Sequence, residues 1–150
     1  MSSRTKWTLA FCIWICVVWG HSLMSGPDSA AESSRFLVLV RPFFELFGCA
    51  DETIMSFFIR KCAHFTEHAI AVMLGWKTAR EWFGESQKAV WITLGIWVFV
   101  PCIDESIQLL VPGRAGMFTD VLIDMSGGFT GLLVMTLLQR IRQDHRSAYY

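Results

Sequence analysis

The sequence predicts an all-α membrane protein: a bundle of four transmembrane helices with an interfacial or re-entrant segment in the first outer loop. Hydrophobic residues make up 53% of the 150 residues, and the mean hydropathy is +0.43; about 45–50% is usual in soluble domains. Four apolar stretches approach or reach the roughly 17–25 residues that cross a bilayer as a helix. They are residues 7–24, 57–76, 89–111 and 120–138. We expect one domain over residues 1–150.

The first stretch, residues 7–24, contains no Asp, Glu, Lys or Arg. Arg4 and Lys6 precede it, as in a secretory signal. Bulky residues such as Trp19 stand where a small-residue cleavage site would be expected, so we favour a first helix that stays in the membrane. A removed signal, cut near Ala31, is the alternative.

The loop over residues 25–56 is too long to be a plain connection. Residues 25–29 are typical of a turn, and residues 35–46 predict an apolar helical stretch interrupted by Pro42. This stretch is short for a span. We therefore predict a piece that lies at the interface or re-enters the membrane, and a fifth span is the alternative.

The remaining three stretches carry ionisable residues near one end. Arg60, His64 and Glu67 share a helix face because they are three or four residues apart. Asp120 and Asp124 are also four apart. The third stretch ends in acids and an amide, at Asp104, Glu105 and Gln108.

Two glycine patterns predict close packing beside these residues. Residues 112–116, Pro-Gly-Arg-Ala-Gly, predict a tight turn that holds Arg114 over the helix ends, where its guanidinium can bind carboxylate or phosphate. Gly127 and Gly131 form a small-xxx-small pattern, which lets another helix approach closely.

Lys and Arg near the ends of the stretches predict the orientation in the membrane. Three groups fall on one side of a four-span bundle, which we take to be the cytoplasm together with both termini. The polar residues then lie at the outer end. The three groups are Arg4 and Lys6; Lys77, Arg80 and Lys88; and Arg140, Arg142 and Arg146.

A charge at the centre of a bilayer costs about 2.5–3.5 kcal/mol on insertion scales. We therefore predict that the polar residues form a ligand-binding site and leave catalytic residues unassigned. The alternative is that their salt bridges only hold the bundle together. The predicted site comprises Arg60, Lys61, His64, Glu67, Asp104, Glu105, Gln108, Arg114, Asp120 and Asp124.

The string from His64 to His68 matches HxxEH, a zinc-protease signature. That chemistry needs a third ligand and a soluble catalytic fold, and this match lies in a membrane helix. We expect no metal and no cofactor, with His68 a chance neighbour at the helix interface. Five acids against three fixed positive charges leave the predicted site two negative if every acid is ionised. This disfavours a phosphate-transfer enzyme, and a proton, a divalent cation or a ligand amine would balance the site better.

The order of the motifs resembles the VanZ-like family over residues 60–131, and the number of helices agrees. The motifs are Arg60-Lys61-x-Ala63-His64-Phe65-x-Glu67, Asp104-Glu105-x-x-Gln108, Pro112-Gly113-Arg114-x-Gly116 and Asp120-x-x-x-Asp124-x-x-Gly127. Where His68 stands, the resemblance would lead us to expect an aromatic residue. The resemblance implies a multi-pass protein of the bacterial plasma membrane, linked to teicoplanin resistance or to modification of the cell envelope.

Three functions remain open. The first is binding of a lipidated glycopeptide or a lipid-linked envelope precursor at the outer leaflet, in contact with membrane lipids. The second is an enzyme that acts on a lipid-linked precursor, and the third is a small proton- or cation-coupled transporter. No basic block suggests a nucleic-acid partner.

Overall fold

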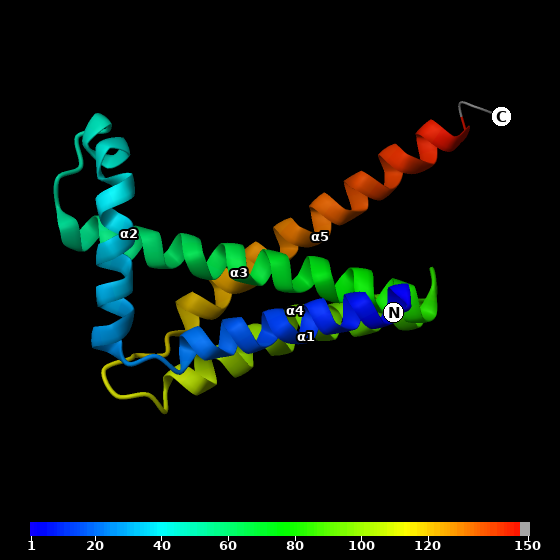
Figure 1. The fold of residues 1–150 in the computed structure, drawn as a ribbon, viewed down its shortest axis with the longest axis horizontal. Coiled ribbons are helices and arrows are strands. Elements are labelled where there is room, and N and C mark those ends of the chain that lie inside the picture. Colours follow the sequence, from blue (N-terminus) through cyan, green and yellow to red (C-terminus); the bar gives the residue numbers. More distant parts are fainter. Residues whose placement is uncertain (148–150) are drawn as a thin grey trace.

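The computed structural model describes residues 1–147, and these contain helices and no strand, which confirms the all-α prediction. There are five helices within this range (Figure 1). They are α1 (Ser3–Ser22), α2 (Gly26–Leu46), α3 (Glu52–Phe83), α4 (Gln87–Gln108) and α5 (Phe118–Ser147).

Helices α1, α3 and α4 lie against one another along the length of the molecule, and α5 crosses α3 obliquely (Figure 1). Helix α2 stands across this bundle because the chain bends by 109° between α1 and α2. A small apolar core of Ile15, Ala71 and Val100 joins α1, α3 and α4. We call the end where α1 and α4 finish the polar end, and the end where α4 begins the opposite end.

Helix α2 confirms the predicted helical stretch over residues 35–46 and differs from the prediction at two points. Residues 25–29 do not form a separate turn, because the Ser25 side chain caps the helix and Pro27 fits its first turn. Pro42 does not interrupt the helix either. Proline removes only one backbone donor, and the carbonyl that would have received it belongs to Val38, whose side chain is exposed.

The predicted stretches lie within or close to α1, α3, α4 and α5, and α3 is much the longest, with 32 residues. Hydropathy marked only the apolar part of α3, whereas the helix starts at an Asp51 cap and continues through Arg80. By length and composition, α4 and α5 could each cross a membrane, and the bent pair α1–α2 could be a third, broken span. Four spans and a re-entrant segment therefore stay predictions.

The predicted close approach of α5 to another helix is confirmed, and its neighbour is α3. A Cβ atom on Gly127 would lie 2.1 Å from the Phe65 carbonyl oxygen, and one on Gly131 would lie 2.4 Å from that of Ala69. Only glycine allows this separation. The two backbones touch just beyond Asp124, which sets that side chain against α3.

The loop between α4 and α5 packs on the turn between α1 and α2. Gly113 has a φ of +75°, as the tight turn requires. The Gly26 N–H donates to the Pro112 carbonyl at 3.3 Å, and a Cβ on Gly26 would lie 2.1 Å from the Gly113 oxygen. This contact holds the α1–α2 turn against the α4–α5 loop at the polar end.

Candidate polar site

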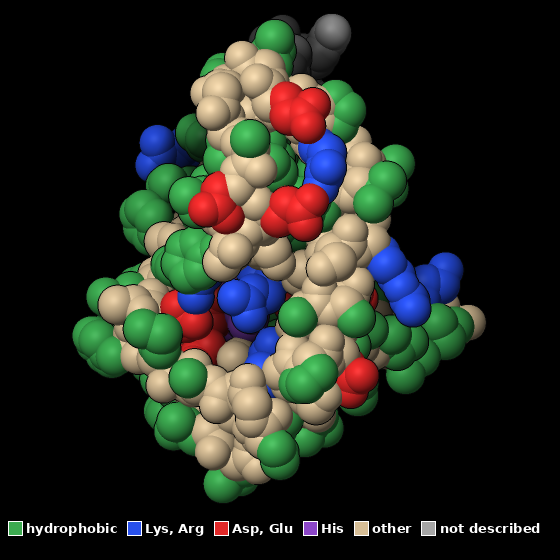
Figure 2. Space-filling model, turned by 90° about the vertical axis from the view of Figure 1, so that its left-hand side faces the viewer, with side chains coloured by type: hydrophobic (Ala, Val, Ile, Leu, Met, Phe, Trp, Pro, Cys, Tyr) green, Lys and Arg blue, Asp and Glu red, His purple; other side chains and the backbone are tan. Residues whose placement is uncertain are grey.

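Figure 2 looks onto the polar end, where acidic and basic side chains gather around a hollow with histidine at its floor. The predicted residues come together here from α3, α4, the α4–α5 loop and α5. They do not form one continuous cluster. The acids of α4 and Asp124 lie together with His64, whereas Lys61, Glu67 and Arg114 have separate partners.

Asp104 is fully buried and joins α4 to the end of α1. The Ser22 hydroxyl at the end of α1 donates to Asp104 Oδ1 at 2.6 Å, and Gln108 Nε2 donates to Oδ2 at 3.2 Å. The same Gln108 nitrogen donates to Glu105 Oε1 at 3.0 Å. The Met117 backbone N–H donates to Glu105 Oε2 at 2.9 Å. These hydrogen bonds fix both carboxylates.

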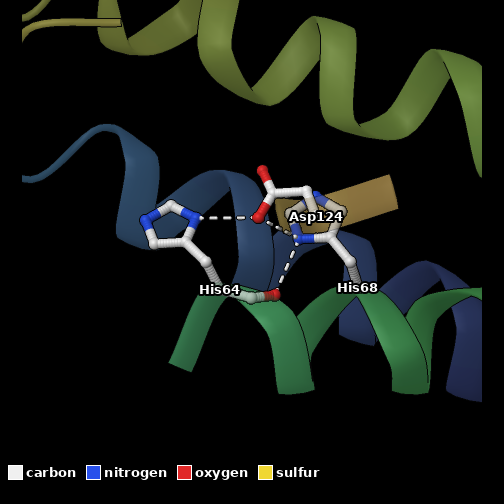
Figure 3. A group of neighbouring side chains, drawn as sticks. All are labelled: His64, His68 and Asp124. Atoms are coloured by element: carbon white, nitrogen blue, oxygen red, sulfur yellow. Dashed lines mark hydrogen bonds and ion pairs between the residues drawn. The ribbon is translucent and has the colours of Figure 1, made fainter. Parts of the chain in front are cut away.

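Asp124 lies between two histidines of α3, as Figure 3 shows. Its Oδ1 is 3.5 Å from His64 Nδ1 and 3.3 Å from His68 Nδ1. His64 Nδ1 is also 3.8 Å from Asp104 Oδ2. Asp124 is 0% exposed, yet within the described residues neither of its oxygens has a hydrogen-bond partner.

Three other predicted residues form ion pairs at the edge of this cluster: Lys61, Asp120 and Glu67. Lys61 forms an ion pair with Asp120, which joins α3 to α5. Glu67 turns towards α1, where its Oε1 lies 2.6 Å from His21 Nδ1. In a zinc protease this glutamate would act at the metal, so its contact with His21 does not fit that arrangement.

A cavity of about 550 Å³ opens beside the cluster, between α2 and α3. Its wall is apolar along the second half of α2 and the start of α3, and it is polar near the start of α2, where Ser29, Glu32 and Ser33 line it. Glu67 also lines the polar end. The polar end includes Arg60 and Arg114, whose buried Nε donors have no hydrogen-bond partner within the described residues. A terminal nitrogen of Arg114 does bind Ser29, at 2.8 Å. The apolar wall includes Phe36, Val40, Phe43, Phe44 and Phe58.

Three side chains at this end were not predicted to belong to the site. His68 is 1% exposed and faces Asp124 of α5, which confirms its predicted place at a helix interface. Its contact with the buried cluster shows that it is not a chance neighbour of the site. Its spacing of four from His64 was the signal that could have found it. Ser22 and His21 end the first apolar stretch, and an adjacent polar pair at that point was a weaker signal.

These features define a helical protein with apolar helices long enough for a membrane and with charged and polar side chains buried at one end. A family profile described as VanZ/LLP1 matches residues 7–139, nearly the whole chain. The chain therefore belongs to the VanZ/LLP1 family, and the predicted resemblance is confirmed over a longer range than residues 60–131. Membership suggests a membrane protein of the kind associated with glycopeptide resistance. No curated protein and no solved structure matches the chain.

Proposed function

We propose that the protein binds an amphiphile, a lipidated glycopeptide or a lipid-linked envelope precursor, in the cavity between α2 and α3. The observation that carries the proposal is the division of this cavity into an apolar wall and a polar end. An acyl chain would lie along the phenylalanines of α2 and α3. Its polar body would meet Arg60 and Arg114.

The two arginines favour a ligand with a carboxylate or a phosphate. Each has a buried Nε donor without a partner in the described residues, and an unpartnered buried donor costs about 1–3 kcal/mol. An anionic group on the ligand would accept from these donors. The planar guanidinium suits this role because it can bind two oxygens at once.

Binding at this place would affect sensitivity to lipidated antibiotics, because the distribution of Lys and Arg predicts that the polar end faces outward. A single cysteine tests this orientation. Ala115→Cys in the exposed α4–α5 loop, in a chain whose five native cysteines are replaced, should react with an impermeant maleimide added to intact cells. Labelling only after the cells are opened would reverse the orientation.

Binding is tested with the full chain in lipid nanodiscs, titrated with teicoplanin, which carries an acyl chain, and with vancomycin, which does not. We expect saturable binding of teicoplanin and at least tenfold weaker binding of vancomycin. Phe36→Asp should weaken teicoplanin binding about tenfold or more, because it places a charge on the apolar wall.

Val38→Asp is the matched control, since Val38 lies about 200° around α2 from Phe36 and does not line the cavity. Equal losses in both variants would contradict the proposed cavity. Equal affinity for the two antibiotics would contradict the role of the acyl chain. In cells, deletion should change the sensitivity to teicoplanin more than to vancomycin. A changed profile of lipid-linked precursors after deletion would instead favour a membrane enzyme.

A further inference from the structure

The buried cluster at the polar end brings together the side chains that commonly hold a metal ion. One set of ligand atoms, all within 4.8 Å of one another, comes from His64, Asp104, Glu105 and Asp124. A second set comes from His64, His68 and Asp124. His64 and Asp124 belong to both sets, so they mark the centre of the cluster.

The distances between these atoms suit a shared cation. Two ligands at about 2.0–2.2 Å from one tetrahedral metal ion are roughly 3.3–3.6 Å apart. His64 Nδ1 lies 3.5 Å from Asp124 Oδ1 and 3.8 Å from Asp104 Oδ2. Both separations are longer than an N–H···O hydrogen bond, which is about 2.7–3.2 Å. The first separation falls within the range for two ligands of one ion and the second slightly exceeds it, so the spacing leaves room for a cation between these atoms.

Unpartnered atoms give a second, independent indication. Asp124 is 0% exposed and both of its oxygens lack a hydrogen-bond partner in the described residues, as does His64 Nδ1. Buried polar atoms are nearly always satisfied, and an ion is one of the ordinary explanations where they are not. These atoms point into the same cluster (Figure 3).

The charges within the cluster also require a positive partner. Asp104, Glu105 and Asp124 are three acids, and among the described side chains, residues 1–144, the ion pairs of these acids are with histidines and not with Lys or Arg. Lys61 pairs with Asp120 instead. A divalent ion would neutralise two of the three negative charges.

The donor set selects the class of ion. Imidazole favours Zn²⁺, Fe²⁺, Co²⁺ and their neighbours over Mg²⁺ or Ca²⁺, and carboxylates complete such sites. His64 also lines the cavity, which would give the ion an entry path and an open coordination position. Glu67 is held by His21, so the arrangement is not that of a zinc protease.

His68 acts differently from His64. Its Nδ1 lies 3.0 Å from the His64 carbonyl oxygen and 3.3 Å from Asp124 Oδ1. A backbone carbonyl only accepts, so this nitrogen carries the hydrogen. The N–H donates to that carbonyl, which fixes the imidazole ring 3.3 Å from Asp124 Oδ1. A ring fixed there can orient the carboxylate, as neighbours of metal-binding carboxylates do.

We propose that His64, Asp104 and Asp124 bind one divalent first-row transition-metal ion, with His68 as a positioning residue. This replaces the expectation from the sequence that no metal binds. The expectation took His68 for a chance neighbour and did not place Asp124 between two histidines. The proposal does not depend on the amphiphile, because the metal alone can be tested.

The test uses the full chain in nanodiscs, treated with a chelator, dialysed and titrated with Co²⁺. We expect a visible absorption band that saturates at one ion per chain, is removed by Zn²⁺ and persists in excess Mg²⁺. Asp124→Asn and His64→Gln should each weaken binding about 100-fold or more. His68→Gln should keep the band but lower the affinity about 10–100-fold, as is usual for a partner of a ligand.

Glu85→Gln is the control, since Glu85 is exposed, lies at the opposite end of the bundle and belongs to neither set of ligand atoms. It should bind Co²⁺ with wild-type affinity. Zn²⁺ should raise the melting temperature of the wild type and not that of Asp124→Asn. If Asp124→Asn does not fold, His64→Gln tests the proposal in its place, by the same loss of Co²⁺ affinity and of stabilisation by Zn²⁺. No saturable band in the wild type, or wild-type affinity in the folded ligand variants, would overturn the proposal.

Discussion

At the opposite end of the bundle, charged side chains pair with one another near the surface, whereas at the polar end several are buried away from Lys and Arg. Lys77 and Glu81 lie 2.7 Å apart, one helical turn from each other, and Arg80 and Glu85 lie 2.6 Å apart. Asp104 and Asp124 are both 0% exposed. Both ends are rich in charged side chains. They differ in how deeply these side chains are buried and in which residues are their partners.

This difference shows which charges need an explanation. Exposed ion pairs contribute about 0–1 kcal/mol and could be replaced by other polar residues. A buried charge that lacks a partner costs several kcal/mol. The charged side chains of the opposite end are explained by their exposure to solvent and their position near helix ends. The buried charges of the polar end are better explained by a bound ligand. The following predictions test this contrast.

The largest effect is expected where α5 meets α3 beside Asp124. Gly127→Ala places a Cβ 2.1 Å from the Phe65 carbonyl oxygen, so the helices must separate. Because the clash is with backbone, we expect a loss of about 3 kcal/mol or more in the free energy of unfolding, measured by denaturant titration in micelles. Gly95→Ala is the control, since a Cβ there meets nothing closer than 3.9 Å. Similar losses in both variants would mean that the packing does not depend on this contact.

The next effect concerns function. Asp104→Asn keeps the size of the side chain and an oxygen for Ser22 to donate to, so the protein should still insert in the membrane. It removes the charge, and we expect antibiotic sensitivity to become that of a deletion strain, with a similar effect for Asp120→Asn. Glu85→Gln at the opposite end should leave sensitivity unchanged. Wild-type sensitivity in both aspartate variants would favour a purely structural role for the polar end.

A smaller effect is expected from one hydrogen bond. Ser22→Ala removes the donor that lies 2.6 Å from Asp104 Oδ1. A bond to a buried charged group is worth about 1.5–3 kcal/mol, and we expect a loss of that size in unfolding free energy. Ser34→Ala on α2 is the control, since the exposed Ser34 hydroxyl donates to the Ala30 carbonyl one turn before it. It should change stability by about 0.5 kcal/mol or less, and an equal loss would show that burial makes no difference.

The two ends also differ in how far the sequence predicted them. Hydropathy located α4 and α5 and the apolar part of α3, because membrane helices need long apolar stretches. Helical spacing put His64, Asp104 and Asp124 at one end. Spacing alone did not predict whether Glu67 or His68 lies next to Asp124. That choice depends on the rotation of α3 against α5, which the contact at Gly127 determines.

Helix α2 was predicted less completely for a different reason. Its first turns are polar, so no apolar pattern marked them, and Ser25 with Pro27 reads equally well as a turn or as the start of a helix. The cavity depends on how α2 lies across α3. The spacing of residues within one helix does not predict how that helix lies against another.

The smallest effect is expected at the opposite end and depends on pH. Hydrogen bonds from Lys77 and then from Ser3 lower the pKa of Glu81 below its ordinary value of 4.5. The ionised form therefore stabilises the fold above pH 4.5, and this contribution is lost as the pH falls through the lowered pKa. Glu81→Gln should lower the melting temperature slightly at pH 7, and its difference from the wild type should shrink below pH 4.5.

Lys77→Gln should reproduce this pH dependence because it removes the first of the two partners. Neither variant should alter the sensitivity of cells or the binding of Co²⁺, since Glu81 lies at the other end of the bundle from Asp124. A difference between Glu81→Gln and the wild type that is the same at pH 7 and at pH 3 would mean that packing, and not the charge of Glu81, causes it. A change in Co²⁺ affinity would mean that the two ends are coupled, and the contrast between them would then fail.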